Sequence, residues 1–187
     1  MITNKKKLKE YLIFEKNIYL PKSRKIEWIL TADNRYYLFK YVKYLRCTEY
    51  YYNTRNRFLH KLKYAYFRRK KCILGRKLGI EMWENTFAKG LRIEHAGNIV
   101  INGHSQIGEN CILHGSNCIG NSGIGSATPR LGNNIRVGVG AKIIGDVELA
   151  DNITVAAGAV VVKSCLIEGA VLAGVPAQVV KIKEKKA

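Results

Sequence analysis

The stretch Leu131–Val155 reads LGNNIRVGVGAKIIGDVELADNITV, and every sixth residue in it is a branched aliphatic. The same step runs from Ile101 to Ala173, where the thirteen positions that it visits hold eleven branched aliphatic residues and two small ones. A helix repeats every 3.6 residues and an ordinary strand every 2, so neither accounts for a period of six. Short strands joined at corners, with one inward aliphatic residue per strand and about three strands per coil, have this period. The sequence therefore predicts a parallel β-helix.

Two departures from the six-residue step indicate irregular places in the coil. An earlier run follows the same step in a register offset by two residues, at Phe87, Ile93 and Ile99. This offset predicts a bulge or an insertion near Asn98–Asn102. Gly125 occupies a core position without a side chain, in the run NSGIGSATPR of residues 121–130, which predicts a loop that leaves the coil.

Charge divides the chain into unlike parts. Residues 1–80 hold 22 Lys and Arg against 5 Asp and Glu, whereas residues 81–187 hold 10 against 9, and all eleven tyrosines lie between Tyr11 and Tyr66. We therefore expect a basic, tyrosine-rich helical segment at residues 1–78, the coil at residues 79–180 and a basic tail at residues 181–187. No apolar run approaches the roughly 20 residues that span a bilayer, and no signal peptide is recognisable.

Helical spacing of apolar residues recurs within the basic segment. It predicts one helix around Lys6–Phe14 and two more between residues 34 and 70, separated by a turn at Asn53 and Thr54. The two longer helices form a hairpin with an aromatic face and a cationic face. The cationic face is either a set of solvated lysines or a contact with an anionic membrane or a pyrophosphate-linked sugar.

The five cysteines follow neither a metal-binding nor a disulfide spacing. We expect reduced, mostly buried thiols and no metal, which suits a cytoplasmic protein, at most at the inner face of the plasma membrane. They are Cys47, Cys72, Cys111, Cys118 and Cys165.

Histidine is the side chain best suited to accept a proton near neutral pH. The coil holds His95, His104 and His114, and none of them lies on the six-residue core step. Each is therefore expected to point outward or toward a corner. His104 has no further support and is interpreted as a surface residue.

Four segments of the coil resemble the hexapeptide-repeat acyltransferases, in particular serine acetyltransferases and the related polysaccharide and sugar O-acetyltransferases. They are RIEHAGNIVI (Arg92–Ile101), IGENCILHGSNCIG (Ile107–Gly120), LGNNIRVGVGAKIIGDVELADN (Leu131–Asn152) and AGVPAQVVK (Ala173–Lys181). The resemblance covers about residues 75–181. It implies a mainly β protein, a left-handed parallel β-helix preceded by a small helical segment. It also implies a homotrimer that transfers an acetyl group from acetyl-CoA to a hydroxyl.

The resemblance implies that His95 is the general base, which removes the proton of the acceptor hydroxyl as that oxygen attacks the thioester. Glu94, Glu81 and Glu84 are candidates for a carboxylate that orients His95, although Glu94 is its neighbour and is expected to point away. His114 lies nineteen residues after His95, close to one coil of eighteen. It is a candidate second catalytic or acceptor-binding group one rung above His95.

The resemblance also implies a groove for CoA between neighbouring coils, lined by small residues and backbone amides. The candidate CoA-binding residues are Val139, Gly140, Ala141, Ala156, Ala157 and Gly158. Lys163 and Lys181 are candidates for its phosphates. Trp83, as a stacking platform, and Arg130 are candidates for acceptor binding.

The loop before Leu131 departs from the serine acetyltransferases. They carry Arg-His-Pro-Lys there, whereas this chain reads Ala127-Thr128-Pro129-Arg130. A carboxylate-bearing acceptor would lose a charge-assisted bidentate contact, so we expect a sugar or polysaccharide precursor instead. Two alternatives stay open: a serine O-acetyltransferase with a divergent loop, and a non-enzymatic basic scaffold that binds membrane or nucleic acid. The absence of a known readout motif argues against nucleic acid.

Overall fold

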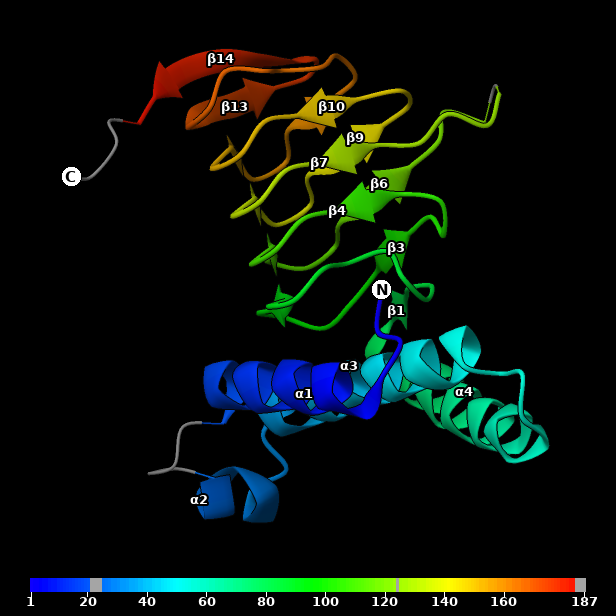
Figure 1. Ribbon diagram of the computed structural model, residues 1–187. Coiled ribbons are helices and arrows are strands. Elements are labelled where there is room, and N and C mark those ends of the chain that lie inside the picture. Colours follow the sequence, from blue (N-terminus) through cyan, green and yellow to red (C-terminus); the bar gives the residue numbers. More distant parts are fainter. Residues whose placement is uncertain (21–24, 124, 184–187) are drawn as a thin grey trace.

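The structure, a computed structural model, describes residues 1–20, 25–123 and 125–183. Helices come first in the chain and form a layer below a stack of coils (Figure 1). They are α1 (Lys5–Tyr19), α2 (Lys25–Leu30), α3 (Asn34–Asn53) and α4 (Phe58–Leu78). The helix predicted around residues 6–14 and the turn between the two longer helices are confirmed.

Strands of two to six residues follow and stack into three faces, in which coil neighbours pair in parallel. The first face holds β1 (Ile80–Glu81), β3 (Ile99–Ile101), β6 (Cys118–Gly120), β9 (Lys142–Ile144) and β12 (Val160–Val161). The second holds β4 (Gln106–Ile107), β7 (Arg130–Leu131) and β10 (Glu148–Leu149). The third holds β2 (Arg92–Ile93), β5 (Ile112–Leu113), β8 (Arg136–Val137), β11 (Thr154–Val155), β13 (Ala170–Gly174) and β14 (Ala177–Ile182). The predicted parallel β-helix is confirmed.

The six-residue step identifies most of the core. Its positions from Ile101 to Val161 are buried, apart from Gly125, which lies exposed in the loop that leaves the coil. The two-residue offset arises before β3, between Ile93 and Gly97. Ile93 pairs with Leu113, twenty residues on, whereas Val100 pairs with Cys118, eighteen residues on, and the amide of Ser116 donates to the carbonyl of Gly97. The irregularity expected near residues 98–102 therefore lies a few residues earlier, in the corner that holds His95.

The step is wrong at its last two positions. Ile167 is 47% exposed, and Cys165 is buried in its place and bridges to Leu149. In β13 the inward residue is Leu172, whereas Ala173 is half-buried. The last turn is shorter than the others, so the register moves by two residues at Cys165. Lys181, expected in a basic tail, lies in β14, which pairs antiparallel with β13.

Asparagines stack along the corner between the second and third faces. The amide of Asn110 donates to Asn134 (3.1 Å), that of Asn134 to Asn152 (3.0 Å), and that of Asn152 to the carboxylate of Glu168 (2.7 Å). All three asparagines have positive φ, which Asn tolerates better than most residues. These hydrogen bonds satisfy the side-chain amides of asparagines that hold the same turn in successive coils.

Close stacking of coils leaves no room for a side chain at Gly138. A Cβ there would lie 2.5 Å from the backbone nitrogen of Ala157, whereas a Cβ at Gly120 would meet only the side chain of Asn102, at 3.3 Å. We expect Gly138→Ala to lower the free energy of unfolding by about 1–3 kcal/mol, since the neighbouring backbone must move. Chemical denaturation measures this, with Gly120→Ala as the control. Equal losses in the two variants would contradict the explanation.

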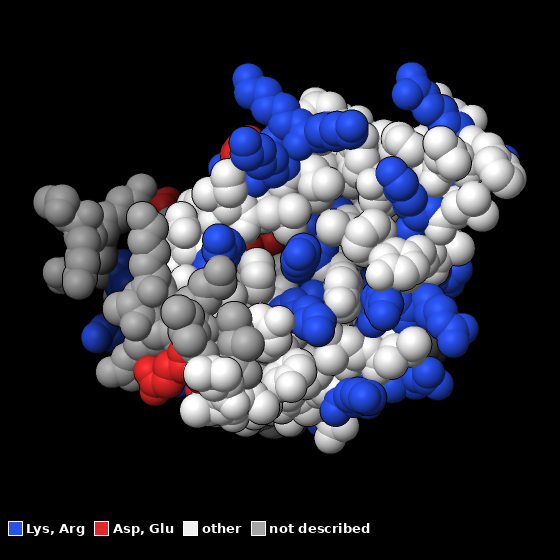
Figure 2. Space-filling model, turned by 90° about the horizontal axis from the view of Figure 1, so that it is seen from below, with Lys and Arg blue, Asp and Glu red and all other residues white. Residues whose placement is uncertain are grey.

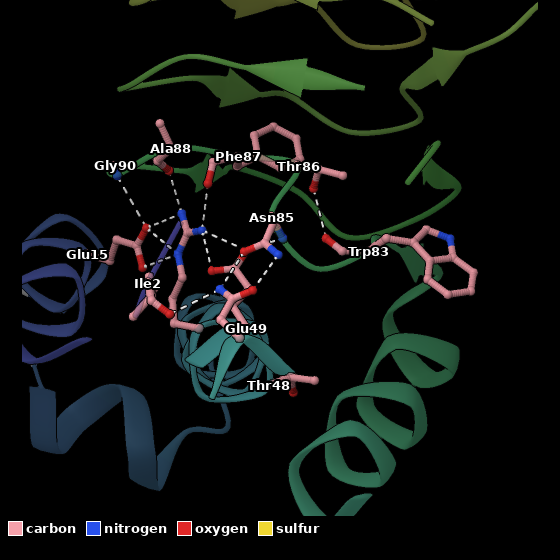
Figure 3. Close-up of polar contacts among 12 residues, drawn as sticks. Ile2, Glu15, Thr48, Glu49, Trp83, Asn85, Thr86, Phe87, Ala88 and Gly90 are labelled. Atoms are coloured by element: carbon pink, nitrogen blue, oxygen red, sulfur yellow. Dashed lines mark hydrogen bonds and ion pairs between the residues drawn. The ribbon is translucent and has the colours of Figure 1, made fainter. Parts of the chain in front are cut away.

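A buried arginine joins the helices to the first coil (Figure 3). The guanidinium of Arg46, in α3, donates to the carboxylates of Glu15 (2.7 Å) and Glu49 (3.0 Å) and to the carbonyl oxygens of Phe87 (2.9 Å) and Ala88 (2.6 Å). Burial disfavours its charge, but Glu49 and Glu15 outweigh this effect and raise the pKa of Arg46. The helical layer and the coil therefore share one hydrogen-bonded core.

None of the helices in the described part of the chain is long and apolar enough to cross a membrane.

Candidate active site

One corner of the coil gathers His95 and the residues predicted to hold CoA. It connects strands of the third face to strands of the first, and we call it the histidine corner. Its four levels are residues 94–98, 114–117, 138–141 and 156–159. His95, His114 and both predicted CoA segments thus lie on one edge of the molecule.

Backbone hydrogen bonds hold these levels above one another. The amide of Ser116 donates to the carbonyl of Gly97 (2.9 Å), that of Gly140 to Gly115 (3.0 Å), and that of Gly158 to Val139 (2.8 Å). Strands at successive levels are about 4.7–4.9 Å apart, so Ala157 stands about 14 Å along the corner from His95.

His95 lies at the lowest level of the corner and is exposed. A Cβ built on Gly115 would lie 3.3 Å from the Cβ of His95, so Gly115 is directly above it. Gly115 has φ +110, a conformation that side chains rarely adopt. The space over the imidazole is therefore kept open by a glycine in the next coil.

His114 is not one rung above His95. The strands pair Ile93 with Leu113, a separation of twenty residues, so His114 follows the level of Glu94 and Gly115 that of His95. The two extra residues lie in the corner itself, between Ile93 and Gly97, because Val100 pairs with Cys118 only eighteen residues on. His114 is half-buried and lies on the same corner, one position out of line.

The three candidate carboxylates have other surroundings. Glu94 forms an ion pair with Arg92 of the preceding strand, β2, at 2.7 Å. Glu84 forms a nearly buried ion pair with Lys71 of α4, also at 2.7 Å, and is thereby a structural residue. Glu81 pairs in register with Val100 on the first face. Within the described residues, neither a hydrogen bond nor an ion pair joins the His95 imidazole to any of them.

Trp83 and Glu81 share a cavity of about 420 Å³ between α4 and the first face. Arg68 and Arg76 also line it, and Arg68 lies 5.9 Å from the centre of the Trp83 ring. His95 is not among the lining residues. As a stacking platform, Trp83 would serve this cavity and not the histidine corner.

Arg130, Lys163 and Lys181 lie outside the histidine corner. Arg130 begins β7 on the second face and pairs with Asp146 at 3.7 Å. Lys163 follows β12, at the corner between the first and second faces. Lys181 pairs with Val171 in the hairpin β13–β14. The structure therefore does not bring these three cations together with His95 in one chain.

Asn117 is a residue of the corner that the sequence did not point out. It is fully buried, its side-chain oxygen accepts from the amide of Gly115 (2.9 Å), and its amide donates to the carbonyl of Gly138 (2.7 Å). It therefore fixes Gly115 above His95. The equivalent position in the next two coils is alanine, at Ala141 and Ala159. A polar Asn in place of these alanines is the sequence signal that could have identified Asn117.

Two of the five thiols are too weakly acidic to act as nucleophiles. Burial raises the pKa of Cys111 to about 12 and that of Cys47 to about 11, so neither forms a thiolate at neutral pH. All five cysteines are free. In the part of the chain that is described, no group of three or more His, Cys, Asp or Glu residues could hold a metal ion.

No protein-family model matches the chain. The serine acetyltransferase of Helicobacter pylori is 33% identical over 107 residues, which are 55% of this chain and 63% of the relative. The serine acetyltransferase of Synechococcus elongatus is 31% identical over 94 residues, which are 49% of this chain and 38% of the relative. The chain is similar to serine acetyltransferases. It matches less than two thirds of the length of either relative.

Solved structures of serine acetyltransferases share the fold over nearly the whole chain. The soybean enzyme complexed with serine has a TM-score of 0.74 at 18% identity, over 94% of this chain and 70% of that one. The Brucella abortus enzyme in complex with coenzyme A has a TM-score of 0.71 at 20% identity, over 96% and 68%. The fold is the left-handed parallel β-helix with a helical segment before it, as predicted.

Proposed function

We propose that the protein is an acetyl-CoA-dependent O-acetyltransferase in which His95 acts as the general base. The observation that carries the proposal is the position of His95, exposed at the foot of a corner whose two upper levels hold only glycine and alanine apart from Val139. Small residues and backbone amides leave room for the extended arm of CoA along the corner. The similarity to serine acetyltransferases supports the same donor.

In the proposed reaction, His95 takes the proton of the acceptor hydroxyl while the hydroxyl oxygen bonds to the thioester carbonyl carbon. The carbon–sulfur bond then breaks, and the departing CoA thiolate takes the proton back from the imidazole. The products are an O-acetyl ester and CoA. No acyl-enzyme is needed, in keeping with the raised pKa of the Cys47 and Cys111 thiols.

We propose a sugar hydroxyl, in a polysaccharide precursor, as the acceptor. The loop that precedes β7 carries neither Arg nor His at residues 127–129. An uncharged acceptor does not need a guanidinium group as an ion-pair partner. Serine is the second candidate, because the relatives are serine acetyltransferases and two related structures hold serine.

The homotrimer and the cytoplasmic location expected from the sequence belong to this proposal. Sedimentation of the purified chain measures the first. An acceptor loop in one copy would then lie within reach of the histidine corner of another, which is how Arg130 would serve as an acceptor-binding residue.

An acceptor screen tests the proposal. Purified protein is mixed with acetyl-CoA and with serine, free sugars or nucleotide-linked sugars, and release of the CoA thiol is followed against a donor-only control. Faster release with sugars supports the proposed acceptor, and faster release with serine establishes the second candidate. If no acceptor releases CoA and acetyl-CoA does not raise the melting temperature, the activity itself is wrong.

Gly115→Ala is expected to lower acetyl transfer about 10-fold to 100-fold, because the new Cβ pushes against His95 and displaces the imidazole. Gly145→Ala, outside the histidine corner, is the matched control. Gly145 also has positive φ (+96), so backbone strain is similar, but its Cβ would meet nothing within 4 Å. Steady-state rates of the two variants are compared after their stabilities are measured. Equal rates in both would rule out a positioning role for Gly115.

A further inference from the structure

A groove between α1 and α3 lies on the helical layer, away from the histidine corner. Its volume is about 620 Å³. Leu8, Leu12 and Ile13 of α1 and Phe39 of α3 line its floor, and Ile13 is 50% exposed. In the single chain, this apolar floor is exposed to water.

Five lysines line the same groove, and no acidic residue does. They are Lys5, Lys9, Lys16, Lys40 and Lys43. Seen from the helical side, Lys and Arg surround uncharged surface, and acidic residues are sparse (Figure 2). We call this feature the lysine groove.

The carboxylates of the helical segment do not neutralise these lysines. Glu10 pairs with Lys89, Glu15 and Glu49 pair with Arg46, and Asp33 pairs with Arg35. In the described part of the helical segment, residues 1–20 and 25–80, no ion pair joins any of the five lysines to a carboxylate. Their charge is therefore available to an anionic partner.

We propose that the lysine groove docks on the surface of an anionic phospholipid membrane. Lysine ammonium groups attract lipid phosphates, and an apolar floor takes up acyl chains beneath them. Both features occur in one groove, on helices whose segment carries a net charge of +17 (22 − 5). A second copy of the chain has no net negative charge to match the groove, since residues 81–187 carry +1 (10 − 9). Nucleic acid would match the lysines, but it would not require the aliphatic floor.

Co-sedimentation of the full chain with vesicles tests the proposal. Vesicles of phosphatidylcholine alone are compared with vesicles of equal parts phosphatidylcholine and phosphatidylglycerol, and binding is expected only to the second. The double variant Lys9→Gln, Lys43→Gln is expected to bind about five-fold more weakly for each lysine removed. Ile13→Ser, which leaves the charge unchanged, is also expected to weaken binding.

The matched control is Lys142→Gln, Lys163→Gln, which removes the same charge from exposed positions on the coil. An equal loss of binding in this control would show that total charge matters and would overturn the proposal. Binding of Ile13→Ser at the wild-type level would also overturn it, because the groove floor would then be unused. A duplex oligonucleotide that binds more tightly than the anionic vesicles, or an oligomer that Ile13→Ser dissociates, would assign the groove to another partner.

Discussion

Replacing Arg46 by methionine is expected to lower the free energy of unfolding by about 3–5 kcal/mol, the largest stability loss that we expect from one side chain. Methionine fills much of the space but leaves the carboxylates of Glu15 and Glu49 buried without their cation. It also removes the donors to the carbonyls of Phe87 and Ala88. Denaturant unfolding followed by circular dichroism measures the loss.

Two comparisons separate this explanation from a simple packing defect. The triple variant Arg46→Met, Glu15→Gln, Glu49→Gln removes both unpaired charges and is expected to recover part of the loss. Arg35→Met breaks an exposed pair with Asp33 and is expected to cost less than about 1 kcal/mol. A triple variant as unstable as Arg46→Met would contradict the charge-based explanation.

The stability loss in Arg46→Met is also expected to depend on pH. Burial raises the pKa of Glu49 above its ordinary value, although Arg46 opposes the shift. Without Arg46 that pKa rises further. A carboxyl whose pKa is higher in the folded than in the unfolded state favours folding at low pH, and this contribution is lost as pH rises through the folded pKa. Arg46→Met is therefore expected to be closer to wild type at about pH 5 than at about pH 8.

His95→Asn is expected to lower the rate of acetyl transfer by about 10²–10⁴ while acetyl-CoA still binds. Asparagine is similar in size but cannot accept the proton of the acceptor hydroxyl. His104→Asn is the matched control, because His104 is also exposed but lies at the corner between the first and second faces. Thiol release measures transfer, and calorimetry measures the affinity for acetyl-CoA.

The two measurements distinguish different errors. If His95→Asn transfers acetyl groups at the wild-type rate, His95 is not the base. If it loses both transfer and acetyl-CoA binding, the histidine corner holds the donor and the imidazole serves binding. If both histidine variants lose activity equally, the loss does not come from the corner.

The sequence predicted the coil because the period depends on one local rule, an inward aliphatic residue at each strand. It failed at Ile167 because Cys165 is also apolar, and only the pairing with Leu149 decides between them. The common corner of His95 and the predicted CoA segments follows from the same period. The one-position error for His114 follows from two extra residues between Ile93 and Gly97, which lengthen that corner.

The carboxylates near His95 were harder to predict because their partners are distant in the chain. Glu84 pairs with Lys71 of a helix, thirteen residues away, and the Arg46 core joins residues 31 to 42 positions apart. No periodic rule links such residues. The available signal was the small number of acidic residues in the basic segment. Only five occur there, and two of them are buried around one arginine.

Each end of the coil carries capping contacts, and these bear on self-association. A β-helix that stopped abruptly would expose unpaired strand edges to further copies of itself. At the lower end, the carbonyls of Leu78 and Gly79, where α4 ends, accept from the amides of Gly97 and Ile99. At the upper end, β14 runs antiparallel to β13 and presents Lys181 along the last edge. These contacts remove two of the strand edges on which an identical coil could stack, so each end of the solenoid is a poorer template for growth into fibres than a bare coil would be.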